Sequence, residues 1–597
     1  MRKLYGALTL LLLSMLFQQC QRELSNIGGP DFPGEIAAPD PITCALQGNV
    51  FDETGAPAAG VTVQAGNKTA ITNARGYFRI NDAGLDKKSA VVTAIKAGYF
   101  KAYRTFAATS GANNIEIKLV KRVLAGTIDA AAGGEASLSN GSKVALPANS
   151  IVSASTNAAY GGSVRVYAAY IDPSAADISQ TVPGSFMATD KDGRRVILTS
   201  YGMLAVELES TSGEKLQIKS GSTATLTTAI PSAAQASAPN TIALWSVDET
   251  TGIWKEEGTA TKSGNVYVGQ VSHFSFWNCD VSQNAVLLSL SLKLPGGESF
   301  VHAKVRIKRN TNNWGSTTYG TTDSVGQVSG YVPYNETLVL DVLDECGNAI
   351  YTQNIGPFTQ NTNLGSITVT APATAMVTVK GKLLNCGNAA VTNGFALITF
   401  GNLTRFASVN ASGDFQTTFI RCAGSPATVD IVGVDNGTQQ QGSTPTAVTV
   451  VTPVTDAGNV SACGTSTVQY INYTLDGTNH SITSSVAGDS LVAYTIDSAG
   501  ANQKTTYVNG FEVGSGTKNI SFVFRHGTNT AGVYPVVTLA VQSFQSNVLL
   551  VSPFNVTVTA FPQTAGQFYE GSFTGGFKDA SNATHTLSGT FKVRRSF

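Results

Sequence analysis

The chain has 597 residues, which is too many for a single hydrophobic core. Its 39 lysine and arginine residues balance its 39 aspartate and glutamate residues, so the composition lacks the excess positive charge typical of nucleic-acid binding. Charged residues make up only 13% of the chain, and short runs rich in Val, Ile, Thr, Tyr and Phe predict an all-β extracellular protein.

Residues 1–19 have the features of an export signal, with two basic residues followed by a short apolar run. The run is too short to span a bilayer comfortably, and it ends at Cys20. This arrangement resembles the lipobox of bacterial lipoproteins, which implies that Cys20 is diacylated and anchors the protein in an outer membrane. Residues 20–43 are then predicted to form a tether that lifts the folded part off the membrane. Ordinary secretion with an unmodified cysteine is the alternative.

Residues 44–122 carry a pattern of short strands separated by glycine turns. The stretch ALQGNVFDETGAPAAGVTVQAG is followed by TNARGYF, and both combine turn residues with alternating apolar positions. The pattern resembles the carboxypeptidase regulatory-like domain. That resemblance implies a small prealbumin-type β-sandwich without any peptidase catalytic residue. The matching positions are Gly48, Asp52, Gly55, Pro57, Gly60, Gly76 and Phe78.

Two later segments repeat this pattern and predict further β-sandwiches over residues 281–372 and 373–463. The second of them reads GKLLNCGNAAVTNGFALITF and then SVNASGDFQTTF, with its glycines in the same order. The first is a weaker copy, whose turn reads TTDSVGQVSGYV. The predicted fold class is therefore all-β, as a tandem array of Ig-like or prealbumin-like sandwiches after a signal peptide.

Residues 123–280 contain ALWSVDETTGIWKEEG and VSHFSFWNCD. These two stretches resemble an ectodomain module shared by cartilage intermediate layer proteins and related single-span receptors, and the resemblance implies no catalytic role. The matching positions are Leu244, Trp245, Asp248, Gly252, Trp254, His273, Phe274, Ser275, Trp277, Asn278 and Asp280.

The stretch VSHFSFWNCD is predicted to be a strand whose aromatic residues belong to the core. Alternation places Phe274 and Phe276 on one face and Trp277 on the other. A metal site built from His273, Cys279 and Asp280 is disfavoured, because six residues of extended strand separate the first two by about 20 Å.

Residues 464–597 are predicted to form a further β domain. In THTLSGTFKVRR the side chains of Leu587, Phe591 and Val593 share one face, which indicates a half-buried strand. The preceding YEGSFTGGF is predicted to pair with it as a hairpin. This ending resembles those of secreted Bacteroidetes-type lipoproteins.

Six cysteines follow Cys20, and an even number in an exported chain favours disulfides. The pair preferred from position in the chain is Cys386 with Cys422. Cys44 and Cys279 are candidates for a bond between the two N-terminal domains, and free buried thiols are the alternative. All six are disulfide candidates: Cys44, Cys279, Cys346, Cys386, Cys422 and Cys463.

The sequence contains no catalytic or metal-binding motif that stands out, so the prediction is a protein that is not an enzyme and takes no cofactor or metal. The first hypothesis is a surface-anchored binding or adhesion lipoprotein whose partner is a glycan or an extracellular protein. Trp314 and Tyr319 are its speculative ligand-binding residues, and packing on their own sandwich is the simpler interpretation. A structural stalk or protein-interaction scaffold is the alternative, and an accessory to a peptidase is a weaker one.

Overall fold

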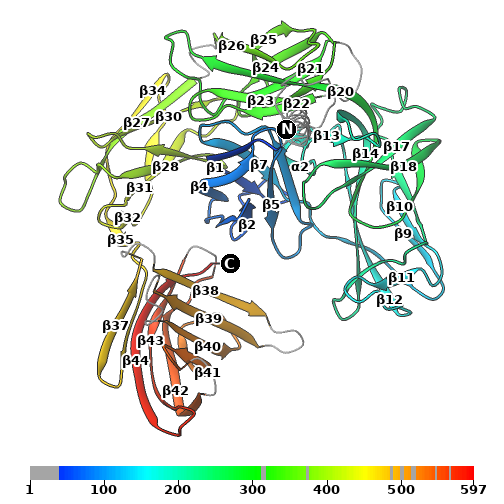
Figure 1. Ribbon diagram of the computed structural model, residues 1–597. Coiled ribbons are helices and arrows are strands. Elements are labelled where there is room, and N and C mark those ends of the chain that lie inside the picture. The colour runs from blue at the N-terminus through cyan, green and yellow to red at the C-terminus, as the bar shows by residue number, and fades with distance from the viewer. Residues whose placement is uncertain are drawn as a thin grey trace, which may run out of the picture.

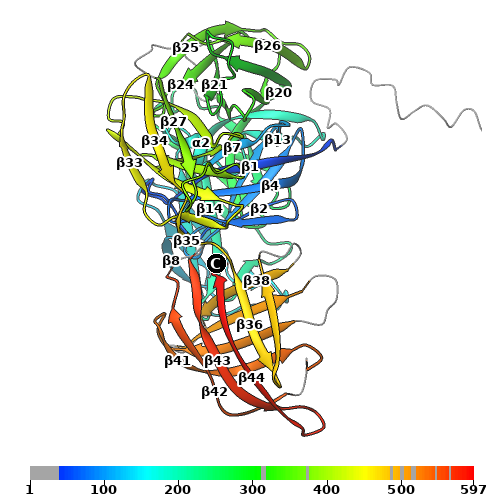
Figure 2. The same ribbon diagram turned by 90° about the vertical axis from the view of Figure 1, so that its left-hand side faces the viewer.

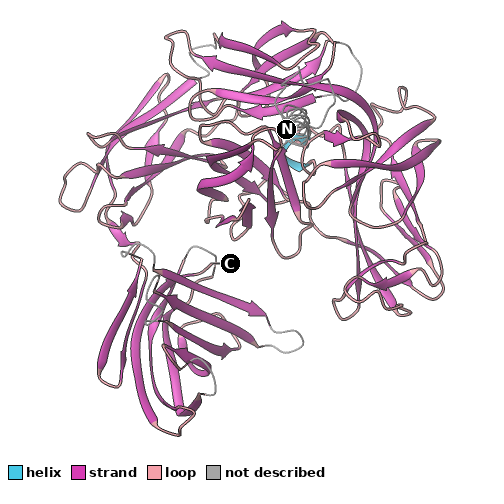
Figure 3. Cartoon of the chain, in the orientation of Figure 1, coloured by secondary structure: helices cyan, strands magenta, loops and turns pink. Residues whose placement is uncertain are grey.

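The computed structural model describes residues 39–310, 317–370, 376–484, 489–497, 503–512, 519–544, 548–563 and 567–596. Nearly every element in these residues is a strand (Figure 3), and the short helix α2 spans Ile178–Thr181. The predicted all-β class is confirmed. None of the described helices has the length and apolar character needed to cross a membrane.

The first sandwich packs a three-stranded sheet against a four-stranded sheet. Its strands are β1 (Pro41–Phe51), β2 (Thr62–Ala65), β3 (Lys68–Ile71), β4 (Tyr77–Asp86), β5 (Ala90–Ile95), β6 (Ala102–Phe106) and β7 (Asn113–Lys118). In the smaller sheet β1 lies between β4, which is antiparallel to it, and β7, which is parallel. The larger sheet has the order β3-β2-β5-β6, and the apolar side chains between the two sheets form one core.

The second and third sandwiches repeat this topology. The second contains β21 (Lys304–Arg309), β22 (Thr317–Thr321), β23 (Gln327–Pro333), β24 (Leu338–Leu343), β25 (Ala349–Ile355) and β26 (Thr362–Thr368), together with the end of β20 (Phe276–Lys293). The third contains β27 (Met376–Leu384), β28 (Gly394–Phe400), β29 (Leu403–Ser408), β30 (Asp414–Ile420), β31 (Thr428–Asp435), β32 (Gln440–Gly442), β33 (Thr446–Thr449), β34 (Val454–Ser461) and β35 (Gly464–Ser466). Within these two sandwiches β20 and β27 each pair with one antiparallel and one parallel strand, as β1 does in the first. Three segments of the chain thus build one fold.

The three sandwiches also share one turn, which explains the glycine recognised in the sequence. In the first sandwich Oδ1 of Asn73 accepts hydrogen bonds from the backbone N–H groups of Arg75 and Tyr77, and Gly76 has a φ of +68°. Asp323 with Gly326, and Asn410 with Gly413, repeat this arrangement. An Asx side chain followed by a left-handed glycine therefore sets the start of the next strand in each sandwich.

A larger module separates the first and second sandwiches in the sequence. Its strands are β8 (Leu124–Asp129), β9 (Gly134–Ser137), β10 (Lys143–Leu146), β11 (Ile151–Ser153), β12 (Ser163–Ile171), β13 (Met187–Thr189), β14 (Arg195–Ser210), β15 (Lys215–Ile218), β16 (Ala224–Ala229), β17 (Thr241–Val247), β18 (Trp254–Ser263), β19 (Val266–Val271) and the first half of β20. β20 pairs with β14 and β17 near its start and with β23 and β26 farther along. The predicted boundary between residues 280 and 281 therefore falls within a strand that two units share.

The stretch VSHFSFWNCD is the start of this shared strand and not one regular strand throughout. The strand begins at Phe276, because the backbone N–H and C=O of Phe274 bond the side chain of Gln217 instead of a neighbouring strand. Phe274 and Trp277 consequently enter the core of the large module, whereas Phe276 enters a core shared with the first sandwich. The prediction that Phe274 and Phe276 lie on one face is wrong, and the prediction that these aromatics are core residues is confirmed.

The C-terminal domain is one antiparallel sheet in the order β37-β36-β44-β43-β42-β41-β40-β39-β38. These strands are β36 (Tyr470–Leu475), β37 (Thr478–Thr483), β38 (Ser490–Asp497), β39 (Lys504–Phe511), β40 (Ile520–His526), β41 (Gly532–Val541), β42 (Leu549–Ala560), β43 (Phe568–Lys578) and β44 (Thr584–Arg594). The sheet coils so that Ala493 on β38 bridges to Arg595, just after β44. The predicted hairpin of β43 and β44 is confirmed, and Leu587, Phe591 and Val593 are buried on its inner face.

The sandwiches are not strung out in a line. Figure 1 shows the first sandwich (blue) at the centre, with the large module, the second sandwich and the third sandwich around it. The side-chain amide of Asn49 in the first sandwich exchanges two hydrogen bonds with the backbone of Thr404 in the third, 355 positions later in the chain. The C-terminal domain lies beyond the third sandwich, apart from this cluster, in both views (Figure 2).

The close packing around the glycine of the shared turn can be tested by substitution. A Cβ on Gly76 would lie 2.4 Å from the carbonyl oxygen of Val50, whereas one on Gly55, which also has a positive φ, would meet nothing within 4 Å. We expect both Gly76→Ala and Gly55→Ala to cost about 1–2 kcal/mol from backbone strain, with a further 1–3 kcal/mol for Gly76→Ala from the clash. Thermal unfolding of the two variants measures the difference. Equal midpoints would contradict this packing of the turn.

Candidate functional site

A chain of polar and charged side chains joins the four units of the cluster at one point. Gln180 from the large module donates a hydrogen bond to Glu116 of the first sandwich. Glu116 Oε1 lies 3.0 Å from Nζ of Lys304 in the second sandwich, and the same Nζ lies 3.5 Å from Glu345. Glu345 in turn accepts a 2.6 Å hydrogen bond from Arg405 of the third sandwich. We call these five residues the junction relay.

The junction relay is largely shielded from water, and its charges depend on one another. Burial by itself raises the pKa of Glu116, but the neighbouring Lys304 and Gln180 outweigh it and hold that pKa below its ordinary value. Burial likewise lowers the pKa of Lys304, and the Glu116 and Glu345 carboxylates raise it by more. Glu116 is therefore kept in its charged form by residues from two other units, and its carboxylate does the same for Lys304.

A loop of the first sandwich is also held by the turn of the second. Oδ2 of the buried Asp323 accepts hydrogen bonds from Oγ1 of Thr109 at 2.7 Å and from the N–H of Gly111 at 3.1 Å. The N–H of Ala112 donates to Oγ of Ser324 at 2.8 Å. Asp323 thus bonds the turn before β23 through Oδ1, and it fixes the loop before β7 of the first sandwich through Oδ2.

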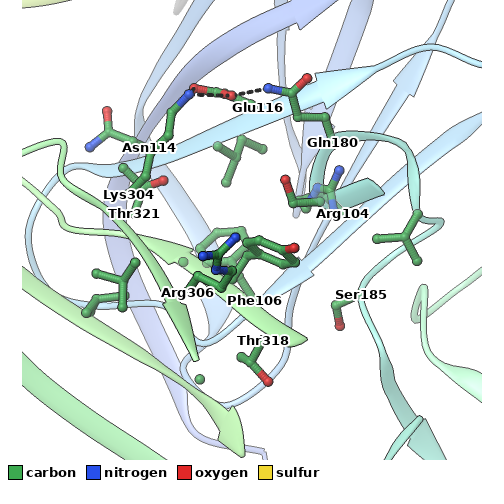
Figure 4. A pocket seen from close by; sticks show the side chains of 18 of the residues that line it. Arg104, Phe106, Asn114, Glu116, Gln180, Ser185, Lys304, Arg306, Thr318 and Thr321 are labelled. Atoms are coloured by element: carbon green, nitrogen blue, oxygen red, sulfur yellow. Dashed lines mark hydrogen bonds and ion pairs between the residues drawn. The ribbon is translucent and has the colours of Figure 1, made fainter. Parts of the chain in front are cut away.

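Beside the junction relay lies a cavity of about 400 Å³. Residues of the first sandwich, of the segment around α2 in the large module, and of the second sandwich form its walls (Figure 4). Four aromatic residues, Phe106, Phe186, Tyr319 and Tyr331, line it together with apolar side chains. The polar part of the lining is mostly amide and hydroxyl groups, from Asn113, Asn114, Gln180, Thr105, Thr109, Thr318, Thr321 and Ser185. Mixed apolar and hydrogen-bonding walls of this size are typical of a small-ligand site.

One charged side chain on the cavity wall is buried without a full set of partners. Arg104 on β6 is 8% exposed, and burial lowers the pKa of its guanidinium to about 10, so it remains charged near neutral pH. Its Nη1 donates to the carbonyl of Gly184 at 3.2 Å, whereas Nε and Nη2 have no hydrogen-bond partner. Two donors of this buried guanidinium are therefore unpaired within the described protein.

The disulfides differ from the predicted pairing. Cys346 bonds Cys422, which joins the second sandwich to the third, and Cys386 bonds Cys463 within the third sandwich. The expected Cys386–Cys422 pair is wrong because Cys422 follows β30 and lies against the turn after β24, which carries Cys346. That turn also carries Glu345, so the bond lies next to the junction relay and to one wall of the cavity.

The other two candidate cysteines do not meet. Cys44 packs in the core of the first sandwich and Cys279 in the core of the large module, so the expected bond between them is wrong. Burial raises the pKa of both thiols, which makes them poor nucleophiles. Both behave as small apolar core residues.

The residues that the sequence suggested as site residues do not come together in one place. Tyr319 lies on β22 and lines the cavity. Trp314 and Cys20 lie outside the described residues. His273, 36% exposed, pairs with Glu257 at 2.7 Å, while Cys279 and Asp280 are buried, so these three do not form a metal site.

Among the described residues one other set could approach a metal ion, namely Asp344 with Cys346 and Cys422. The two sulfur atoms are joined to each other in the disulfide. They therefore offer no thiolate to a metal.

Arg104, Glu116 and Lys304 were not identified from the sequence as site residues. Each is a charged residue within an ordinary strand, and each contacts a residue of a neighbouring unit. The one available signal was an arginine in KAYRTF, between a tyrosine and a threonine that are themselves buried.

A second hollow lies on the C-terminal domain. It is lined by hydroxyl and amide side chains of adjacent strands, among them Asn472, Thr474, Ser572, Thr574, Ser588 and Thr590. No lysine, arginine, aspartate or glutamate lines it. It lacks the buried charge that sets the junction cavity apart, so we take the junction cavity as the candidate site.

No protein-family model matches the chain, and no curated protein matches it either. Among solved structures, the shaft pilin SpaA from Lactobacillus rhamnosus GG is similar over 30% of this chain and 100% of its own, with 8% identity and a TM-score of 0.18. BcpA, the major pilin subunit of Bacillus cereus, is similar over 55% of this chain and 100% of its own, with 10% identity and a TM-score of 0.13. At TM-scores this low the similarity carries no argument about function.

The junction relay predicts a pH dependence of stability. Because the folded protein lowers the pKa of Glu116, the stabilisation is present above the ordinary glutamate value of about 4.3 and is lost as the pH falls through the folded value. Glu116→Gln should cost about 1.5–3 kcal/mol at neutral pH and flatten the dependence of the unfolding midpoint between pH 6 and pH 3. Glu298→Gln, at an exposed glutamate outside the relay, is the control and should leave that dependence unchanged. The same slope in the wild type and Glu116→Gln would contradict the relay.

Loss of the Cys346–Cys422 disulfide should change both the stability of the protein and local hydrogen exchange. Replacing Cys346 and Cys422 together with serine should lower the free energy of unfolding by about 2–4 kcal/mol. It should also speed hydrogen exchange at the amide of Glu345, which donates to the carbonyl of Ile420 in the third sandwich. The matched control replaces Cys386 and Cys463, which should leave exchange at Glu345 unchanged. Equal exchange in both double variants would show that the Cys346–Cys422 bond does not hold this wall.

Proposed function

We propose that this chain is a non-enzymatic, surface-anchored binding protein that holds a carbohydrate group in the junction cavity. The observation that carries the proposal is the cavity itself, with its aromatic and apolar surfaces beside amide and hydroxyl groups. A sugar ring has the complementary chemistry, because it combines apolar C–H faces with a rim of hydroxyl groups. Amphipathic aromatic side chains suit such ligands, since they offer apolar area at little entropic cost.

The way the walls are held supports the proposal. The large module and the first and second sandwiches each contribute residues to the cavity, and the junction relay and the Cys346–Cys422 bond fix these units relative to one another. A site whose walls are already fixed loses less conformational freedom when a ligand binds. The arrangement thus favours binding without catalysis, in which rigid supports position a recognition surface.

The proposal also includes attachment of the chain to the membrane by a lipid. Acylation of Cys20 would attach the chain to the outer membrane, and residues 20–43 would carry the cluster away from it. The described part of the chain begins its first strand at Pro41, close to the end of that tether. Ligands outside the cell would then have access to the cavity.

A structural scaffold that binds other proteins is the second candidate function. It is favoured by apolar side chains on the outer surface of the C-terminal domain, where Val533 is 62% exposed and Leu549 is 66% exposed. Exposed apolar groups of this kind mark protein contacts when they form a continuous patch. Binding of an extracellular protein with no response to any glycan would favour this function.

The proposal predicts glycan binding that depends on Tyr319. The chain from Gln21 onward, which lacks the acylated cysteine, is applied to a broad array of glycans and polysaccharides. Tyr319→Ala should weaken binding about tenfold, because it removes an aromatic wall of the cavity. Tyr351→Ala, in the same sandwich but away from the cavity, is the control and should bind as the wild type does. Silence across the array would overturn the glycan proposal and leave the scaffold.

A further inference from the structure

Two rows of uncharged polar side chains cross the outer face of the C-terminal sheet. The strands β37, β36, β44, β43 and β42 are successive neighbours in that sheet, and each contributes two residues that are two positions apart. Such residues point to the same face of a strand. The register then aligns them across the sheet, as Ser481, Asn472, Thr590, Ser572 and Thr557 in one row and Asn479, Thr474, Ser588, Thr574 and Asn555 in the other. We call these ten residues the polar strip.

The polar strip lines an accessible hollow. All ten residues border the hollow of about 830 Å³ on this domain, and every other residue of its lining also belongs to the domain. The domain lies apart from the four-unit cluster in both views (Figure 2). Because neighbouring strands are about 4.8 Å apart, the five strands extend the strip over about 19 Å. This length exceeds that of a single sugar unit, so the strip suits an elongated ligand.

Much of the hydrogen-bonding capacity of the strip is not used by the protein itself. On β36 and β37, Oγ1 of Thr474 donates to Oδ1 of Asn479 at 2.7 Å, and Oγ of Ser481 donates to Oδ1 of Asn472 at 2.7 Å. The six strip residues on β44, β43 and β42 form no side-chain hydrogen bond to any described residue. Their hydroxyl and amide groups can both donate and accept. The centre of the strip therefore presents donors and acceptors to a partner.

The strip carries no charge, although charged residues lie on both sides of it. On one side Lys592 pairs with Glu570 at 3.0 Å, and on the other Nδ1 of His585 lies 2.6 Å from Asp476. These groups are already paired, and none of them borders the hollow. A charged ligand would meet no counterion in the strip and would lose hydration without compensation. The surface thus favours a neutral ligand.

The chemistry of the strip also argues against other macromolecules. A nucleic acid needs basic residues for its phosphates, and a membrane surface needs apolar side chains beside basic ones. The centre of a protein interface is enriched in aromatic, methionine and arginine side chains. Among the described residues that line this hollow, Val533 is the one large apolar side chain that is strongly exposed. A neutral polysaccharide instead repeats hydroxyl groups along its whole length, as the strip repeats their partners from strand to strand.

We propose that the polar strip binds one extended chain of a neutral, β-1,4-linked polysaccharide that lies along the two rows, across the five strands. Consecutive sugar units then exchange hydrogen bonds with consecutive strands. The β-1,4 link is assigned because it keeps a chain extended, whereas an α-1,4-linked chain coils and would leave a straight row after a few units. This site is separate from the junction cavity and does not depend on the function proposed for that cavity.

The first test compares neutral oligosaccharides of one composition and two shapes. Cellohexaose and maltohexaose contain the same sugar, but the former is β-1,4-linked and the latter α-1,4-linked. Both are titrated calorimetrically against the chain from Gln21 onward, beside the β-1,4-linked hexamers of mannose and xylose and the matching disaccharides. At least one β-linked hexamer should bind at least tenfold more tightly than maltohexaose and than its own disaccharide, because only an extended hexamer contacts the whole strip.

Variants then locate the binding on the strip. Ser588→Ala with Thr590→Val removes the two central hydroxyl groups and should weaken binding of that hexamer about tenfold. Thr538→Val with Thr584→Val removes two exposed strand hydroxyls outside the hollow and should bind as the wild type does. Both double variants should unfold at the wild-type temperature, since all four side chains are exposed.

A second pair of strip residues keeps the test decisive if the first variant does not fold. Ser572→Ala with Thr574→Val, on the neighbouring strand β43, should weaken hexamer binding by a similar factor. Equal binding by the wild type and by the folded strip variants would overturn the inference.

The remaining outcomes separate this site from the junction cavity. Tyr319→Ala should leave hexamer binding unchanged. Binding that is lost in Tyr319→Ala and kept in the strip variants would overturn the inference and support the junction cavity. Binding that only the strip variants lose, with the junction cavity silent toward every glycan, would support the inference while the function proposed for the cavity fails.

Three further results would each overturn the inference. The first is that no β-linked hexamer binds. The second is that a β-1,4-linked hexamer of glucuronic acid binds more tightly than every neutral hexamer. The third is a concentration-dependent dimer in sedimentation velocity that the strip variants abolish, because a second copy of the chain would then cover the strip.

Discussion

The junction relay is the interaction on which the rest of the structure depends. Gln180, Glu116, Lys304, Glu345 and Arg405 come from four separate units and alternate in charge so that each partly buried ion meets an opposite one. Removing one member would leave a neighbour charged and poorly hydrated, and such arrangements specify one geometry even where they add little net stability. The relay therefore helps to fix the four units as one cluster with a defined cavity.

The turn that recurs in the three sandwiches also takes part, in one of them, in packing between units. An Asx residue and a left-handed glycine start the fourth strand in all three sandwiches. In the second sandwich the Asx residue is Asp323, whose additional carboxylate oxygen binds the loop of the first sandwich. An asparagine at that position would offer an N–H₂ group in place of one acceptor oxygen. The choice of aspartate at this turn therefore contributes to the packing of the second sandwich against the first.

Sequence reasoning was successful where the physical cause is local. Alternating apolar residues predicted the all-β class and the inward face of Leu587, Phe591 and Val593, because burial on one side of a sheet repeats every second residue. It failed for the Cys386–Cys422 pair, for the alignment of Phe274 with Phe276 and for the burial of Arg104. These depend on which unit packs against which strand, and contacts between positions 355 residues apart leave no periodic trace in the sequence. Tyr319 lines the cavity, but the sequence alone does not show that two other units form the remaining walls of that cavity.

The four units form one cluster around a preformed cavity. Residue-resolved hydrogen exchange on the chain from Gln21 onward tests it at the amides of Gly111, Ala112 and Thr404, which donate to side chains of other units. We expect slow exchange at all three amides, comparable with that of strands at the edges of the sandwich cores. Rapid exchange at these three amides, with the sandwich cores still protected, would show independent units on a string and contradict the cluster.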